Sequence, residues 1–291
     1  MRVHEHLLAR ADLSTADRQR AQHGLALDFL KAGLLDRAED ALRKLEGSPY
    51  EGQARLARLA IYERSREWPQ AAQVAELLER SGEANFSVRQ AHYRCEQARE
   101  AFSQGDTDRA LALLQETVQA IPHAPRARIL MGQLLLTRQQ PRQSMEALRP
   151  LFEQNDPTAP LAAATLAKAA LACSQESAAR QLLQDFYLQQ PSLDVLEALV
   201  ALDAPTGIDI RPPFLQHLQK HPSLLAASRW LAAAPAQEAV PPAVQKALDT
   251  AARPLARYRC AACGFEAKEH FWHCPGCQAW DSYPPRRVEE L

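Results

Sequence analysis

The chain contains little glycine, few aromatic side chains and no excess of charge of either sign. Ten glycines among 291 residues leave little material for glycine-rich loops, and no phosphate-binding loop of that type is present. The formal net charge is −1, with acidic and basic residues interspersed. Such a balance argues against an electrostatic footprint for DNA or RNA, so we expect no nucleic-acid partner.

Long apolar runs are also missing. The best candidate for a membrane span, residues 161–172, is short and contains Lys168. No secretory signal precedes the chain, which disfavours a secreted, disulfide-stabilised domain. The sequence has no nucleophilic serine motif and no carboxylate pair in an acid–base context. We therefore expect no catalytic residues, no cofactor-binding residues and no enzyme activity.

What the sequence does contain is typical of helices. Alanine, leucine, glutamine and arginine dominate, and β-branched residues are few. These residues lose little freedom in a helix, so the expected fold class is all-α.

A repeat becomes visible when small residues are aligned. The matched positions are separated by 33, 39, 34 and 35 residues, which is the period of tetratricopeptide helix pairs. They are Ala38, Ala71, Ala110, Ser144 and Ala179. An irregular helical bundle is the alternative, and several features recurring in phase argue against it. The sequence predicts a tetratricopeptide-repeat superhelix in which each repeat supplies two antiparallel helices.

The repeat also predicts where helices meet and end. A small residue in each first helix lets its partner approach closely; these are Ala26, Ala98, Gly132 and Ala167. Gly33 and Gly105 are expected to end first helices in a left-handed conformation. Prolines 122, 191 and 222 are expected to follow second helices, because proline cannot continue the hydrogen-bond ladder.

The two ends of the predicted superhelix are less regular. Beyond residue 191 the repeats degenerate, and we expect helices near 192–202, 212–220, 224–233 and 242–252. At the other end, residues 2–10 are interpreted as a second helix without its first, which would leave the apolar side chains of Val3 and Leu7 uncovered. The chain therefore looks truncated at its start, as an expressed fragment would be.

Four cysteines carry the most specific chemistry. Cys260 and Cys263 form one Cys-x-x-Cys pair, and Cys274 and Cys277 form a second pair ten residues later. This spacing is typical of a tetrahedral four-thiolate metal site. Disulfides and thioredoxin-like redox chemistry are disfavoured, since the chain has no secretory signal and no βαβ pattern. Zinc is favoured as the cofactor and iron is the alternative, because four thiolates accept either metal.

The remaining cysteines and the aromatic residues have different expected roles. Cys95 and Cys173 lie in helical stretches and are expected to be small buried residues. Six aromatic residues crowd the cysteine segment, namely Tyr258, Phe265, Phe271, Trp272, Trp280 and Tyr283. A ribbon this small cannot bury so many rings by itself, so we expect some of them to dock on the repeat helices. His273 is expected beside the site rather than in it, and the pair Arg286–Arg287 is expected to be solvated.

The combination of repeats and cysteine segment resembles a known family. Residues 258–265, residues 272–280 and the stretch 32–40 resemble the lipopolysaccharide assembly protein B family, as does the opening at residues 2–6. The similarity runs over nearly the whole chain and is loosest between 204 and 251. The predicted domains are a tetratricopeptide array over residues 1–253 and a rubredoxin-like ribbon over residues 254–291. The family's four cysteine ligands correspond to Cys260, Cys263, Cys274 and Cys277.

The resemblance implies a function. It implies an adaptor that regulates lipopolysaccharide synthesis by promoting degradation of the deacetylase that commits precursor to lipid A. The implied partners are the membrane AAA+ protease FtsH, that deacetylase and a lipopolysaccharide-sensing membrane protein. The implied location is the cytoplasmic face of the Gram-negative inner membrane, reached through an anchor helix. That helix is not in this chain, so the chain itself is expected to be soluble. Either the chain is an expressed fragment, which the uncovered first helix favours, or this homologue naturally lacks the anchor. A homo-oligomer is left open.

Three other functions remain as alternatives. Rubredoxin-like sites with iron carry electrons, so an electron carrier on a repeat scaffold is one of them. A general protein-assembly scaffold would differ from the adaptor only in its partners. Zinc ribbons also occur in nucleic-acid readers, which the near-zero net charge disfavours.

Overall fold

The computed structural model describes residues 2–82, 85–204, 209–235, 238 and 240–291. The chain consists of two compact units, Met1–His123 and Ala124–Leu291. Both units are built from antiparallel helices, and the only paired strands in the described residues lie in the second unit. The predicted all-α fold class is thereby confirmed. No helix within the described ranges is both long enough and apolar enough to cross a membrane.

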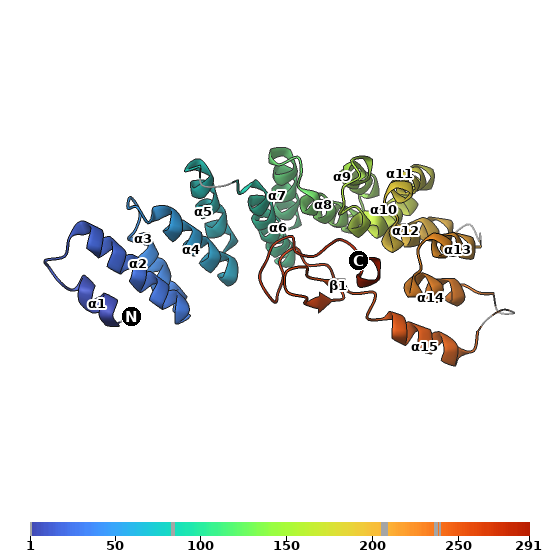
Figure 1. The fold of residues 1–291 in the computed structure, drawn as a ribbon. Helices are drawn as coiled ribbons and strands as arrows, with labels where there is room; N and C mark the ends of the chain where they lie inside the picture. Colours follow the sequence, from blue (N-terminus) through green and yellow to red (C-terminus); the bar gives the residue numbers. More distant parts are fainter. Residues whose placement is uncertain (1, 83–84, 205–208, 236–237, 239) are drawn as a thin grey trace. The chain divides into compact units, whose positions relative to one another are not determined.

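The first unit is a succession of helix pairs (Figure 1). A short helix α1 packs on α2, and α2 pairs with α3, α4 with α5, and α6 with α7. Their bounds are α1 Arg2–Leu8, α2 Thr15–Lys31, α3 Leu35–Arg43, α4 Glu51–Ser65, α5 Trp68–Arg80, α6 Ser87–Ser103 and α7 Thr107–Ala120.

The second unit continues with α8 paired to α9 and α10 paired to α11, followed by four further helices and the cysteine segment. The helices are α8 Pro125–Thr137, α9 Pro141–Glu153, α10 Pro160–Cys173, α11 Glu176–Gln189, α12 Leu193–Asp203, α13 Arg211–Lys220, α14 Leu224–Ala232 and α15 Pro242–Ala252. The strands are β1 Tyr258–Arg259 and β2 Glu266–Ala267, and a short 3-10 turn, η2, spans Val288–Glu290. The helices expected in the degenerate region are thus confirmed. The expected break between array and ribbon at residue 253 remains a prediction.

The aligned small residues lie where the repeat requires them. Ala38, Ala71, Ala110, Ser144 and Ala179 are all 0–1% exposed, each on the second helix of its pair. The Ser144 hydroxyl donates a hydrogen bond to the Gly132 carbonyl, with an O···O distance of 2.7 Å. Because neither residue has a bulky side chain, the two helix backbones approach closely at this point.

The turn inside each pair contains one residue in the left-handed region. Gly33 and Gly105 have φ values of +73° and +86°, as expected for helix ends. In the other three pairs the same place is taken by Arg66, Gln139 and Ser174, with φ between 55° and 61°. Each of the five residues precedes the aligned small residue by five positions. The sequence showed glycine only twice at this place, although the backbone conformation recurs in every pair.

We expect Gln139→Gly to stabilise the protein by about 0.5–1 kcal/mol, because glycine adopts this conformation without the strain of a Cβ. The matched control is Gly105→Ala, where a Cβ would meet no atom within 4 Å and only the backbone would be strained. It should lose about 1 kcal/mol. Urea unfolding midpoints measure both changes. A loss of stability for Gln139→Gly alongside no loss for Gly105→Ala would contradict the argument.

A buried histidine of the second unit is expected to make its stability depend on pH. His217 on α13 is 5% exposed, and its Nδ1 lies 2.6 Å from the Tyr187 hydroxyl. Burial, and then the neighbouring His221, lower the pKa of His217 below its ordinary value. The unfolded chain therefore takes up this proton first, below about pH 6.5. Above that pH His217 is neutral in both states and costs no stability. As the pH falls toward the lower pKa of the folded state, proton uptake by the unfolded chain lowers the free energy of unfolding.

The expected result is a free energy of unfolding that declines between pH 7.5 and pH 5.5. In His217→Gln the decline should be smaller, since this proton uptake is removed. Urea titrations at the two pH values test it. Equal slopes for the two proteins would assign the pH dependence to other groups.

Candidate metal centre

The four cysteine sulfurs are gathered at one point of the second unit. All four Sγ atoms lie within 4.8 Å of one another. Cys260 Sγ is 3.8 Å from Cys277 Sγ, and Cys263 Sγ is 3.7 Å from Cys274 Sγ. Disulfide sulfurs are about 2.05 Å apart, so these separations are not disulfides. All six cysteines of the chain, each within the described ranges, are free thiols.

The spacing of the sulfurs fits a tetrahedral ion. With metal–sulfur bonds of about 2.3 Å, the sulfurs of a regular tetrahedron are about 3.8 Å apart. Cys260 and Cys274 are buried, whereas Cys263 and Cys277 are exposed, so one side of the cluster faces solvent. Zinc and iron both suit four thiolates at these distances, and the identity of the metal stays open.

Each Cys-x-x-Cys pair is folded into the same turn. The Cys260 carbonyl accepts from the Gly264 amide at 2.9 Å, and the Cys274 carbonyl accepts from the Gln278 amide at 2.8 Å. The residue after each second cysteine is left-handed, Gly264 with φ +78° and Gln278 with φ +61°. The turns are held by two short hairpins, β1–β2 and a single antiparallel bridge between His273 and Trp280. The local backbone thus brings both pairs of sulfurs together.

The thiols differ in their tendency to ionise. Burial alone would raise the pKa of Cys260, but the Ser282 hydroxyl 3.2 Å away and nearby backbone amides outweigh it and lower the pKa to about 6. At Cys263 the Phe265 amide favours the thiolate. Burial and the adjacent sulfurs outweigh that amide, so the pKa rises to about 12. Neighbouring sulfurs raise the pKa of Cys263, and a cation at the centre of the cluster would favour its thiolate.

The other residues singled out in the sequence lie outside the cluster. The His273 ring stacks on Trp280 with centroids 4.2 Å apart, beside the site as expected. Cys95 is fully buried on α6, and Cys173 is half-buried with its Sγ 3.5 Å from the sulfur of Met145. Both behave as packing residues.

Aromatic residues of the ribbon, residues 258–284, pack on the helices of the second unit. Trp272 packs against the apolar core formed by α8 to α12, and the Arg126 guanidinium of α8 lies over the Trp280 ring at 6.0 Å. The Tyr258 hydroxyl is 3.3 Å from a carboxylate oxygen of Asp194 on α12. Docking on the repeat helices is thereby confirmed.

A segment that the sequence did not single out as structural joins the ribbon to two helices. We call Arg287–Glu290 the strap. Its Glu290 carboxylate accepts from the Leu193 amide at 2.7 Å, at the start of α12. Its Glu289 carboxylate accepts from the Leu224 and Leu225 amides at the start of α14. The strap therefore supplies acceptors to the unpaired first amides of both helices.

Arginine 287 holds the strap in place. Its guanidinium donates to Asp194 Oδ1 at 2.6 Å and to the Ala256 carbonyl at 2.8 Å. It also lies over the Tyr258 ring at 5.2 Å. The expectation that Arg286 and Arg287 are both solvated is wrong for Arg287, which is half-buried, and holds for Arg286, which is exposed. The contact between Arg287 and Asp194 joins residues 93 positions apart, so no local sequence pattern predicts that Arg287 is half-buried.

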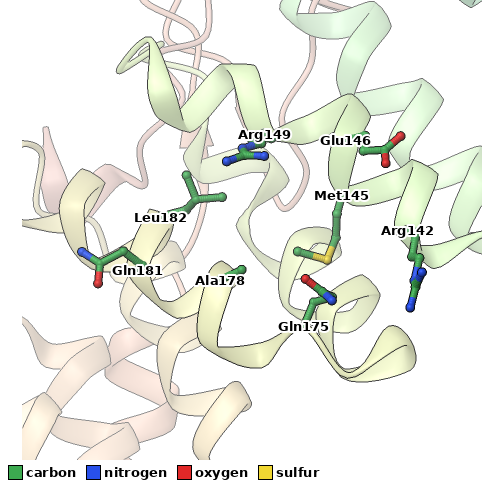
Figure 2. Close-up of a pocket in the computed structure, with 8 residues that line it drawn as sticks. All are labelled: Arg142, Met145, Glu146, Arg149, Gln175, Ala178, Gln181 and Leu182. Carbon is green, nitrogen blue, oxygen red and sulfur yellow. The ribbon is translucent and has the colours of Figure 1, made fainter.

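A surface groove lies between the second helices of two neighbouring repeats. It has a volume of about 460 Å³ and separates α9 from α11, and Figure 2 shows Met145 and Leu182 in the space between them. Arg142 and Arg149 on α9 and Gln175 and Gln181 beside or on α11 give it a polar rim. Such a groove has the dimensions of a site for a few side chains of a protein segment.

Comparison with known proteins agrees with these observations. Residues 258–284 match the rubredoxin metal binding domain, and residues 101–159 match the tetratricopeptide repeat. Lipopolysaccharide assembly protein B of Escherichia coli strain K12 is 28% identical over 298 residues, which span 99% of this chain and 76% of that protein. The resemblance to lipopolysaccharide assembly protein B is confirmed.

The protein of the same name from Haemophilus influenzae is 24% identical over 308 residues, covering all of this chain and 75% of that protein. A solved structure titled "Functional Characterization of Pseudomonas Aeruginosa pilF" covers 75% of this chain and 98% of its own at 21% identity, with a TM-score of 0.39. A score this low adds nothing to the assignment. The chain thus combines tetratricopeptide repeats with a metal-binding ribbon, the two features on which the resemblance to lipopolysaccharide assembly protein B depends.

Proposed function

We propose that this protein is a non-enzymatic adaptor in lipopolysaccharide assembly. The observation that carries the proposal is similarity to lipopolysaccharide assembly protein B over 99% of the chain, including the ribbon. Tetratricopeptide repeats present extended surfaces that hold segments of other proteins, which supports a scaffold rather than a catalyst.

The metal ligands we propose are Cys260, Cys263, Cys274 and Cys277. The tetrahedral spacing of their sulfurs supports this assignment. A bound zinc would supply folding free energy and no redox chemistry. The ribbon then has a structural role. Its folded state would stabilise the helices that Trp272 and Tyr258 contact.

At a finer level, we propose that the adaptor delivers the deacetylase of the lipid A pathway to the membrane protease FtsH, at the cytoplasmic face of the inner membrane. A lipopolysaccharide-sensing membrane protein would restrain it. The groove between α9 and α11 offers a place for a partner segment.

The test is the lifetime of the deacetylase in Gram-negative cells that lack their own lipopolysaccharide assembly protein B. Supplying this protein should shorten the deacetylase half-life several-fold after protein synthesis is blocked, and only when FtsH is active. An unchanged half-life, with the adaptor present at normal levels, would refute the proteolytic role. Cross-linking followed by identification of partners would then distinguish a general assembly scaffold.

One observation favours a second function. Two of the four clustered cysteines, Cys263 and Cys277, are exposed residues, as an electron-transfer site at the surface would need. Elemental analysis separates the two readings. An iron-loaded protein with reversible one-electron reduction would support an electron carrier, and a colourless protein with one zinc per chain would exclude it.

A further inference from the structure

The strap connects three parts of the second unit that are distant in sequence. Its backbone runs beside the segment between α15 and the ribbon, with the Val288 amide donating to the Arg257 carbonyl at 2.7 Å and the Glu289 amide to the Leu255 carbonyl at 3.3 Å. Its side chains reach the first turns of α12 and α14. The strap therefore contacts the segment leading to the ribbon and the first turns of both helices, so that its conformation depends on all of them.

The two helix starts depend on the strap to different degrees. At α12 the residue before the helix, Ser192, makes no capping hydrogen bond with its side chain, and Glu290 provides the acceptor for Leu193. At α14 the Ser223 hydroxyl accepts from the Ala226 amide and donates to Glu289 at 2.7 Å. Glu289 thus fixes the capping serine and accepts two further amides. Negative charge at the start of a helix is also favoured by the helix dipole.

The ribbon determines where the strap lies. Tyr258, at the first strand of the ribbon, contacts both Asp194 and Arg287. Tyr283, four residues before Arg287, is buried, and its hydroxyl donates to the Phe265 carbonyl at 3.1 Å. The folded ribbon therefore holds Tyr258 and Tyr283, the two ends of a long loop, in one cluster. This places the strap beside the starts of α12 and α14. Without a folded ribbon, closing that loop would cost chain entropy.

We propose that the strap is a metal-dependent latch, in which the order of the four-cysteine ribbon is transmitted through Arg287, Glu289 and Glu290 to the first turns of α12 and α14. Loss of metal releases the strap and opens the starts of α12 and α14, while α9, α10 and α11 keep their packing. This inference depends on the metal site proposed above. It adds a conformational response of the helices next to the ribbon.

Hydrogen exchange on the whole protein tests the latch. Removing the metal with a chelator should speed exchange roughly tenfold in peptides covering 193–197 and 224–228, the size of effect that losing helix caps produces. Peptides from α9 and α11 should change little. Unchanged exchange at the two helix starts, with the ribbon itself exchanging freely, would overturn the proposal.

Variants separate the strap from the metal. Glu289→Ala with Glu290→Ala should speed exchange at the same two segments while the protein keeps its metal, and metal removal should then add little. Glu269→Ala, an exposed acidic residue of the ribbon, is the matched control and should behave as the unmodified protein. Glu289→Gln with Glu290→Gln retains the acceptors and should give an intermediate result, including in the event that the alanine variant does not fold. Exchange in the alanine variant equal to that of the unmodified protein both with and without metal would refute the latch.

The outcomes also distinguish this inference from the function on which it depends. A protein that binds no metal at all would refute the proposed metal site. A protein that binds metal but shows no change at α12 and α14 on its removal would refute the latch alone.

Discussion

Replacing Cys260 and Cys263 with serine is expected to abolish stoichiometric metal binding and to lower the thermal stability of the second unit. Two of the four clustered sulfurs disappear, and two thiolates cannot complete a tetrahedral shell. Because metal binding supplies folding free energy, the loss should amount to several kcal/mol. Each kcal/mol corresponds to a melting temperature lower by about 2–4 °C for a unit of this size.

Elemental analysis and differential scanning calorimetry measure the two effects. Cys173→Ser is the matched control, because Cys173 is a half-buried thiol in a helix and outside the cluster. It should keep the metal and most of the stability. If the double variant retained both its metal content and its melting profile, neither the ligand assignment nor the stabilising role of the ribbon would stand.

The sequence is informative wherever a local rule decides the structure. The small residues Ala38 and Ala179 lie at helix contacts because the repeat leaves no room for larger ones. Proline 122 follows α7, which ends at Ala120, because proline lacks the amide that a helix would need. The Cys-x-x-Cys spacing likewise predicts two turns that bring their sulfurs together, and the cluster of Cys260, Cys263, Cys274 and Cys277 has that geometry.

What the sequence did not reveal depends on contacts between distant residues or on strain that is tolerated. Arg66, Gln139 and Ser174 adopt a glycine-like conformation because the packing of each helix pair fixes the turn, whatever residue is present. Glu290 reaches an amide 97 positions away, so no local pattern marks it as a helix cap. Counting five residues back from each small residue could have found the turns. Nothing comparable could have found the strap.

Gly132 on α8 lies where α8 and α9 approach one another closely, since its carbonyl accepts from the Ser144 hydroxyl on α9. A Cβ added to Gly132 would lie 2.6 Å from two side-chain carbons of Leu148, and the Leu148 side chain is fully buried. Gly132→Ala should therefore destabilise the protein by about 1–3 kcal/mol through overpacking, even though alanine is the better helix former. Urea unfolding measures the change.

A compensating substitution makes this test specific. Leu148→Ala alone should cost about 2–5 kcal/mol, because it leaves a cavity in the core around α9 and α10. Combined with Gly132→Ala, the added methyl group enters the space that Leu148 vacates, so the double variant should be more stable than the sum of the two losses predicts. Strict additivity would mean that the two side chains do not compete for space. The small residue in the first helix would then have a role other than the close helix contact that defines the repeat.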